Sequence, residues 1–240
     1  MASFPLSDLD NPLIKKGKTA QLAKRRERKG KGEKPLGWKV GFGAPASLQR
    51  LGLAAPCVGY LMQRALLLSG STVSLAGWAK PVAEPEIAAR MARDLRGGAS
   101  AEEAAAAVKD IFPAIELADL ADPPTPDNLD TVLEGDIYQR HVILCGNTRP
   151  GLDLSGLTSR VTRRGAEAAR STDPQALTGK LVDIIAHVAS VLAAFGEKLA
   201  AGDVIITGSI TPPINIEADE TELAHAVDPI GEVSVRFSRD

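Results

Sequence analysis

The chain has 240 residues, a formal net charge of −2, and ordinary shares of hydrophobic (44%) and charged (24%) residues. This length allows one sizeable core, and the near-neutral charge excludes a strong overall attraction to a polyanion such as nucleic acid. Two cysteines are too few for a disulfide scaffold and suit a reducing compartment. The sequence shows no secretory signal pattern and no apolar run of membrane-spanning length. We therefore expect a cytoplasmic protein with no membrane partner.

The first 36 residues stand apart by their positive charge. We expect a helix over 19–28 with few apolar contacts, Leu22 among them, and lysines and arginines crowd positions 15–31. Such a helix is either solvated or packed on a partner subunit. The alternative is a basic arm that binds nucleic acid, which the lack of aromatic residues here disfavours. The chain divides on this basis into a basic helical segment, 1–36, and a main domain, 37–240.

A lysine occupies the first predicted strand, which covers 36–40 and is bounded by glycines. Side chains alternate along a strand, so Trp38 and Val40 share one face and Lys39 takes the other. Lys39 either serves a site on that side of the sheet or is an edge-strand lysine that discourages aggregation. A short helix over 44–51 and further strands over 55–61 and 72–75 are predicted next.

Two glutamates two residues apart, Glu84 and Glu86, lie in the strand predicted over 80–89 and project from the same face. A third, Glu116, lies in another predicted strand, where Ile115 and Leu117 would face a core. If the strands are neighbours, the three carboxylates converge, and they repel one another unless they are solvated, protonated or bridged by a cation. Three carboxylate oxygens suit Mg²⁺ or Mn²⁺ better than Zn²⁺. The alternative is that these are solvent-facing acids on edge strands.

The remaining pattern predicts short elements in no regular β-α-β order. A capping box at Ser100 begins a helix to Asp110, and Pro113 opens the strand of Glu116. A Pro/Asp-rich loop over 122–128 is either the wall of a site or a plain surface connection. A second helix begins at Asp173-Pro174 and reaches Phe195. Further strands are expected over 141–145, 158–163, 204–207 and 233–237. This order predicts an α+β fold built on a mixed, rolled β-sheet.

Several short motifs occur together in one order. They are Gly37-Trp38-Lys39-Val40-Gly41, Glu84-Pro85-Glu86, Asp94-Leu95, Pro113-Ala114-Ile115-Glu116, Asp127-Asn128, Ala201-Gly202-Asp203 and Thr207-Gly208-Ser209-Ile210-Thr211. In these motifs the chain resembles the 2-keto-4-pentenoate hydratase and 4-oxalocrotonate decarboxylase group of the fumarylacetoacetate hydrolase superfamily. It departs from that group at Cys57, where an acid is usual, and at Leu129-Asp130, where a serine usually follows the Asp-Asn pair.

The resemblance implies a fold of the fumarylacetoacetate-hydrolase C-terminal-domain type and makes 37–240 a metal-binding catalytic domain. It implies that Glu84, Glu86 and Glu116 hold Mg²⁺ or Mn²⁺ and that Lys39 is catalytic. Ser209 and Thr211, with backbone N–H groups of the preceding glycine turn, would bind the carboxylate of a small 2-oxo acid. It also implies a homo-oligomer.

The activity implied is a hydratase, a lyase that adds water to a 2-hydroxy-2,4-dienoate through a metal-stabilised enolate. The alternatives are a 4-oxalocrotonate-type decarboxylase and an acylpyruvate C–C hydrolase. The hydrolase is disfavoured because His141, His187 and His225 lie outside the early region where such enzymes carry a lid histidine. A basic-helix nucleic-acid-binding protein is the non-enzyme alternative, and we expect no nucleic-acid partner.

Overall fold

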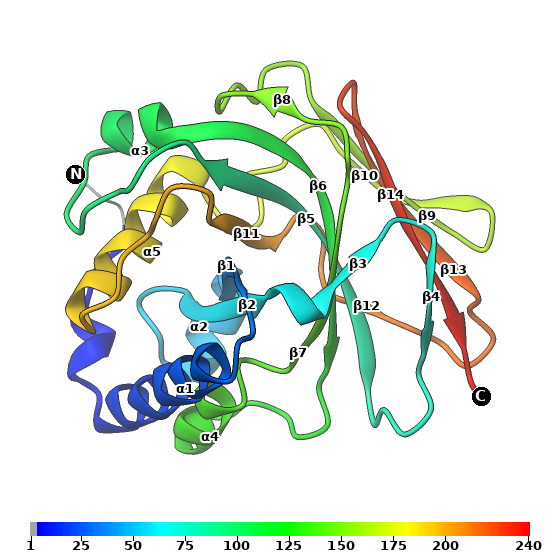
Figure 1. The fold of residues 1–240 in the computed structure, drawn as a ribbon. Coiled ribbons are helices and arrows are strands. Elements are labelled where there is room, and N and C mark those ends of the chain that lie inside the picture. The colour runs from blue at the N-terminus through cyan, green and yellow to red at the C-terminus, as the bar shows by residue number, and fades with distance from the viewer. Residues whose placement is uncertain (1–3) are drawn as a thin grey trace.

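Two β-sheets dominate the computed structural model, which describes residues 4–240 (Figure 1). The larger sheet follows the order β2-β1-β11-β5-β6-β7-β3, with β12 added beside β5 and β8 beside β6. Its strands are β1 (Pro35–Gly41), β2 (Cys57–Met62), β3 (Leu66–Leu68), β5 (Pro81–Met91), β6 (Val108–Asp119), β7 (Gln139–Leu144), β8 (Arg149–Pro150), β11 (Val204–Ser209) and β12 (Ile214–Asn215). Pairings β1–β11 and β3–β7 are parallel and the others are antiparallel. The sheet curls into a half-barrel, so the predicted α+β fold with a mixed, rolled sheet is confirmed.

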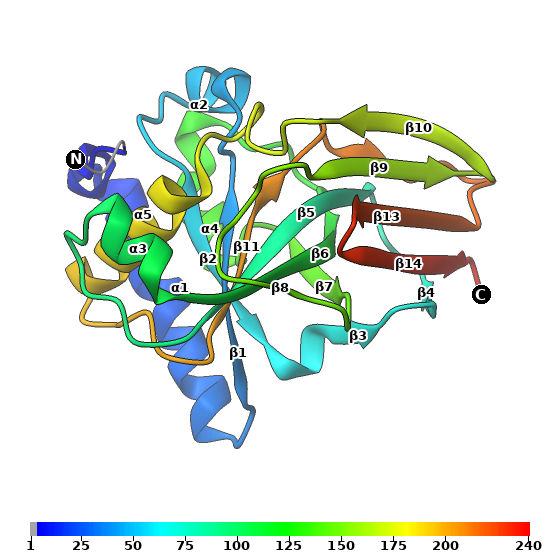
Figure 2. The same cartoon turned by 90° about the horizontal axis from the view of Figure 1, so that it is seen from above.

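The second sheet has five strands in the order β10-β9-β13-β14-β4. These are β4 (Ser71–Ser74), β9 (Thr158–Arg163), β10 (Ala166–Ser171), β13 (Glu222–Asp228) and β14 (Gly231–Ser238). The helices are α1 (Pro12–Gly30), α2 (Pro45–Leu51), α3 (Ala101–Ala107), α4 (Leu129–Glu134) and α5 (Leu181–Ala194), with short 3₁₀ turns η1 (Ser7–Asp10), η2 (Gln63–Ala65) and η3 (Pro126–Asn128). Figure 2 shows the second sheet on one side of the larger sheet and α1, α3 and α5 on the other.

The alternation of β6 assigns its two faces. Ile115 and Leu117 are fully buried in a core cluster shared with Val161, Leu223 and other residues of the second sheet. A separate cluster, which includes Trp38, packs the larger sheet against α5. With Ile115 and Leu117 committed to the second sheet, Glu116 between them faces the concave side of the half-barrel.

Strand β6 begins earlier than the sequence suggests. The helix α3 ends at Ala107 instead of Asp110, and the strand runs on through Pro113. Pairing with β8 stops at Ile111 and pairing with β7 starts at Ala114. Pro113 therefore lies where neither strand needs its missing N–H, which is the kind of position that proline tolerates in a sheet.

Helix α5 begins at Leu181, eight residues after the predicted start at Asp173. The segment before it forms turns, and Gly179 has φ +93, a left-handed conformation that interrupts a right-handed helix. The apolar periodicity from Leu181 onward is as predicted, and nine residues of the helix are buried.

Helix α1 is longer than predicted and packs against α4 of the same chain. Leu22 joins the core that contains Trp38, and the Arg25 guanidinium lies 4.2 Å from the Trp38 ring centroid. Its outer cations pair with acids elsewhere in the chain, as in Lys16–Asp130 (2.7 Å) and Arg26–Glu197 (2.9 Å). Among the helices of residues 4–240, none combines the length and apolar character needed to cross a bilayer.

Candidate metal centre

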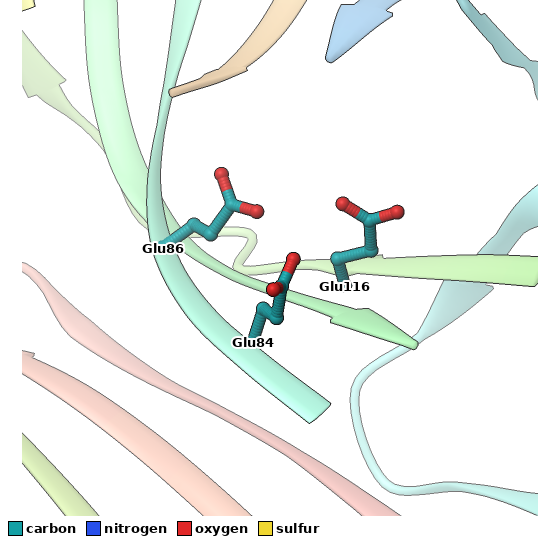
Figure 3. A group of neighbouring side chains, drawn as sticks. All are labelled: Glu84, Glu86 and Glu116. Atoms are coloured by element: carbon teal, nitrogen blue, oxygen red, sulfur yellow. The ribbon is translucent and has the colours of Figure 1, made fainter. Parts of the chain in front are cut away.

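Three glutamates converge on the concave side of the half-barrel. Glu84 on β5 is paired directly with Glu116 on β6, and Glu86 follows two residues along β5 on the same face. Figure 3 shows the three carboxylates pointing into one space, and one oxygen from each lies within 4.8 Å of the others. Glu86 and Glu116 have no solvent exposure, whereas Glu84 is half-buried. The structure thus brings together the three predicted ligands, and they are not solvent-facing edge residues.

The hydrogen bonds of these carboxylates leave oxygens free on the inner side. The backbone N–H of Gly208 donates to Glu86 Oε2 (2.5 Å), and Lys39 Nζ donates to Glu116 Oε1. Glu86 Oε1 and Glu116 Oε2 are buried without any hydrogen-bond partner. Buried polar atoms are almost always satisfied, and free carboxylate oxygens that converge are the donor set that a hard divalent cation takes. The residues present therefore fit a divalent metal ion.

The raised pKa values of the three glutamates also favour a bound cation. Burial, followed by the charges of Glu116 and Glu84, raises the pKa of Glu86 well above its usual range. Burial likewise raises the pKa of Glu116 to about 8 against the opposing charge of Lys39, and it raises the pKa of Glu84. A shared site that disfavours three negative charges is stabilised by an added positive charge.

Lys39 is fully buried and held from two sides. Its Nζ donates to Glu116 and to the carbonyl oxygen of Ile137 (3.1 Å). Burial alone would lower the pKa of Lys39, but the charges of Glu116 and Glu84 outweigh it, so the pKa is raised. β1 lies between β2 and β11, so Lys39 is not an edge-strand residue.

The turn that follows α4 holds Lys39 in place, and sequence reasoning missed it. Asp136, Ile137 and Tyr138 all have φ between 54° and 64°, a left-handed conformation that costs non-glycine residues energy. Asp136 is buried and its Oδ1 accepts from the Tyr60 N–H (2.8 Å). Burial raises the pKa of Asp136 to about 7. The only sequence signal was an acid after the glycine that ends α4.

The Asp127-Asn128 pair, one of the motifs that carry the resemblance, does not line the cleft. There, Asp127 is exposed, and the Asn128 side chain accepts from the Thr125 N–H (2.8 Å) and so caps the 3₁₀ turn η3. Asp136, nine residues later, is the acid that the structure places near Lys39.

A close approach requires the glycine at position 59, which lies opposite Lys39 on β2. A Cβ there would come within 2.7 Å of Lys39 Cγ and 2.9 Å of Asp136 Oδ1. The missing side chain leaves the space in which the lysine and the aspartate lie side by side.

An open cleft of about 700 Å³, its mouth included, leads to this centre. Its polar lining residues are Lys39, Ser47, Arg50, Glu84, Tyr138, Thr178 and Ser209. Pro124 of the predicted wall loop also lines it. Ser209 lines the cleft, and its hydroxyl makes a long contact of 3.5 Å with Pro85 O. Thr211 is not among the lining residues, and its hydroxyl donates to Pro212 O (3.1 Å).

Three features of the sequence fall outside the cleft. Cys57 lines a smaller cavity with Lys18 and His187, and burial raises the pKa of its thiol to about 12. The three histidines do not line the cleft. His187 Nε2 lies 2.8 Å from Pro56 O, and His225 lies between Ala114 O and Ser159. The arginines Arg163, Arg164 and Arg170, which are close together in the sequence, each pair with an acid.

The rolled sheet and its carboxylate centre define a known class. Residues 45–237 match the family described as fumarylacetoacetate (FAA) hydrolase C-terminal, and the chain belongs to this enzyme family. The resemblance carried by the motifs is thereby confirmed.

Particular relatives have two different activities. The chain is 29% identical over 218 residues to 2-hydroxyhexa-2,4-dienoate hydratase of Comamonas testosteroni, covering 89% of this chain and 82% of the relative. It is 27% identical to 4-oxalocrotonate decarboxylase of a Pseudomonas species, covering 80% and 74%. A solved structure of 4-oxalocrotonate decarboxylase from Pseudomonas putida G7, complexed with magnesium and adipate, is similar with a TM-score of 0.85 at 24% identity, covering 97% of this chain and 89% of that one.

Proposed function

We propose that this protein is a divalent-metal-dependent lyase that adds water to a 2-hydroxy-2,4-dienoate. The observation that carries the proposal is the set of converging, partly unsatisfied carboxylates beside a buried lysine at the base of an open cleft. Relatives named 2-hydroxyhexa-2,4-dienoate hydratase and 2-keto-4-pentenoate hydratase support this choice of reaction. The relative's structure with magnesium, and the hard oxygen donors here, support Mg²⁺ or Mn²⁺.

Each residue of the centre has a role in this proposal. Glu84, Glu86 and Glu116 would hold the ion, and the Gly208 N–H fixes the orientation of Glu86. The bound ion supplies Lewis acidity that stabilises negative charge on the oxygens of a 2-oxo acid. Lys39 donates a hydrogen bond to the developing enolate oxygen and moves a proton there.

Ser209, which lines the cleft, would bind the substrate carboxylate. Its hydroxyl makes only a long contact to Pro85 O and can turn toward a ligand. The Gly208 N–H cannot share this task as the sequence suggested, because it is committed to Glu86. Thr211 keeps at most a supporting role, since its hydroxyl is bonded to the neighbouring carbonyl.

The proposed reaction balances without any redox partner. The dienol first becomes the conjugated oxo acid, as the 2-hydroxyl proton is lost and C5 gains a proton. Water then adds across C3 and C4, with its oxygen on C4 and a proton on C3. The net change is the addition of one molecule of water. Groups whose pKa values lie near neutral pH can transfer the protons in both steps.

Decarboxylation of a 4-oxalocrotonate-type substrate is the second candidate, because a relative of similar identity has that activity. An acylpyruvate C–C hydrolase is less well supported, since no histidine among the described residues lines the cleft to activate water. The nucleic-acid alternative is also weakened, because several cations of α1 are paired with acids of the same chain.

A mass-resolved assay tests the proposal. Purified protein is incubated with 2-hydroxypenta-2,4-dienoate, 4-oxalocrotonate or fumarylpyruvate, each with Mg²⁺, with Mn²⁺ and with a chelator. We expect metal-dependent gain of 18 mass units from the dienoate, the mass of one water. Loss of carbon dioxide as the sole reaction would favour the decarboxylase, and cleavage into two acids the hydrolase. Turnover that persists in chelator would refute metal dependence.

We also propose that the chain forms a homo-oligomer. Light scattering on the purified protein tests this directly, and a monomer at micromolar concentration would refute it.

A further inference from the structure

Thr178 brings to the cleft a hydroxyl that the described part of the chain leaves without a hydrogen-bond partner. The residue lines the cleft and is only 7% exposed. The side-chain hydrogen bonds of its segment are made by Ser171, Asp173 and Gln175 instead. Because nearly all buried polar groups have a partner, this hydroxyl is available to a molecule that enters the cleft.

Two glycines make room for the Thr178 side chain. A Cβ at Gly208 would lie 3.2 Å from Thr178 Cγ2 and 3.7 Å from its Oγ1, and a Cβ at Gly43 would lie 3.6 Å from Thr178 Cγ2. Gly208 also has φ +93, a left-handed conformation that favours glycine. The methyl group of Thr178 therefore packs toward both glycines, which leaves the hydroxyl as the part of the side chain that can meet a ligand.

The turn before α5 holds Thr178 in this position. The Gly179 N–H donates to Gln175 O (3.0 Å), and the Leu181 N–H donates to Gln175 Oε1 (3.0 Å). The Gln175 N–H in turn donates to Asp173 Oδ1 (3.0 Å). These bonds fix the backbone around Thr178, and a side chain on a fixed backbone can place a small molecule accurately.

Thr178 also lies beside the carboxylate centre. The glycine on which its methyl group packs, Gly208, is the residue whose N–H donates to Glu86. Ser209, the next residue, lines the same cleft. One glycine thus separates the Thr178 hydroxyl from a carboxylate of the centre, so a molecule bound to this hydroxyl would be close to a substrate held there.

The proposed reaction needs a group of this kind, because the other polar groups near the centre already have partners or roles. The three glutamates would hold the ion, Lys39 donates to Glu116, and Ser209 would bind the substrate carboxylate. The Tyr138 hydroxyl donates to Asp122 O. A threonine hydroxyl can both donate and accept a hydrogen bond, as holding a water molecule requires.

We propose that the Thr178 hydroxyl positions the water molecule that adds to C4 of the substrate. This rests on the proposed function and assigns a residue to its second step. The water oxygen forms the bond to C4 while the electrons of the C3–C4 double bond move toward the 2-oxygen. One water proton stays on the new hydroxyl, the other passes to solvent in the open cleft, and C3 takes up a proton in its place. Thr178 keeps its own proton and acts by orientation.

The two steps of the reaction, followed separately, test this role. Wild type, Thr178→Val, Thr178→Ser and the exposed control Thr72→Val are incubated with 2-hydroxypenta-2,4-dienoate and Mg²⁺ in D₂O. Nuclear magnetic resonance follows deuterium entry at C5 and hydroxyl formation at C4. Valine keeps the packing and removes the hydroxyl, so Thr178→Val should slow the addition about 10–100-fold and leave the C5 step within about twofold. The conjugated oxo acid should then accumulate, and Thr178→Ser should recover most of the loss.

Binding of a substrate analogue separates this role from a contact with the substrate itself. The analogue 2-oxopentanoate has no C3–C4 double bond and cannot add water. Calorimetry with Mg²⁺ should give affinities within about twofold for wild type and Thr178→Val. A loss of about tenfold or more would assign Thr178 to substrate binding and overturn the proposal.

The kinetic outcomes distinguish this proposal from the proposed function. Equal rates of water addition by wild type and Thr178→Val would overturn the role of Thr178 and leave the hydratase standing. An equal slowing of both steps in Thr178→Val would also overturn it, because a positioned water acts only in the second. If wild type forms no C4 hydroxyl from the dienoate, the proposed function fails and the role of Thr178 fails with it.

Discussion

Lys39 and Glu116 form a buried ion pair although β11 and β5 separate their strands in the sheet. In a flat sheet, the backbones of β1 and β6 would run parallel to each other and lie three strand spacings of about 4.8 Å apart, which is about 14 Å. The curl of the half-barrel turns the two side chains toward each other across its concave face. The rolling of the sheet thus builds the centre, since it brings the lysine of β1 to the glutamates of β5 and β6.

Replacing the buried lysine should separate chemistry from metal binding. We predict that Lys39→Met lowers kcat at least about 100-fold, because the proton donor is lost, while Mg²⁺ affinity changes less than about tenfold. Without metal the variant should be destabilised by about 3–5 kcal/mol, since Glu116 loses its buried partner. Steady-state kinetics, calorimetry and urea unfolding measure the three effects, with the exposed Lys34→Met as control. Kinetics equal to wild type would show that Lys39 is only structural.

The close approach at Gly59 provides a test of how Lys39 is positioned. A Cβ at this position would overlap Lys39 Cγ and Asp136 Oδ1, so Gly59→Ala should cost about 1–3 kcal/mol of stability and reduce kcat about tenfold or more. Gly146→Ala is the matched control, because a Cβ there meets nothing within 4 Å. If both variants keep full activity, the packing of Gly59 against Lys39 is not needed for catalysis.

Asp136 should make the protein less stable as the pH rises. Its pKa is about 7 in the folded chain against a usual 3.8, so between these values the native state holds a proton that the unfolded chain has lost. The free energy of unfolding therefore falls with rising pH in that window, by at most about 1.4 kcal/mol per unit from this group. Asp136→Asn keeps the acceptor for the Tyr60 N–H and should make the decline shallower. Urea unfolding at pH 4.5, 5.5 and 6.5 measures it, with Asp127→Asn as control, and an unchanged slope would contradict the assignment.

Metal affinity should increase with pH. The pKa of Glu116 is raised to about 8 and that of Glu86 well above its usual range, so protons compete with the ion at neutral pH. Apparent Mg²⁺ affinity should rise between pH 6 and pH 8 by up to about tenfold per pH unit for each proton that the ion displaces. Calorimetry in buffers of different ionisation enthalpy would also detect the released protons. Affinity that is constant or falls over this range would mean that the ion binds elsewhere.

Strand alternation predicted that Glu84 and Glu86 share a face and that Glu116 points away from Ile115 and Leu117, but it left open whether the two strands are neighbours, and the ligand role of the glutamates came from the resemblance. The same alternation predicted that Lys39 lies on the opposite face of its strand from Trp38. It could not show that Lys39 reaches Glu116, since that depends on how far the sheet rolls. Asp136 was missed because three successive left-handed residues have no local sequence signal when none of them is glycine.

Errors in the predicted elements have similar causes. The sequence predicts that Pro113 begins a strand. In the structure Pro113 lies inside β6, at the gap between the pairing with β8 and the pairing with β7. Strand β10 was not predicted, because its alanines and charged residues show no alternation of apolar and polar positions. It lies at the edge of the second sheet and pairs only with β9. The helix predicted from Asp173 does not form before Gly179, and Leu177 and Thr178 of that segment line the cleft instead.

Titration of the purified, metal-free protein with Mn²⁺ or Mg²⁺ tests the central claim most directly. Calorimetry compares wild type with Glu86→Gln, which can still accept from the Gly208 N–H, and with the exposed Glu222→Gln as control. The account predicts one ion per chain in wild type and Glu222→Gln, and at least about tenfold weaker binding in Glu86→Gln with its fold intact by circular dichroism. Wild-type affinity in Glu86→Gln, or no ion bound by the wild type, would contradict it.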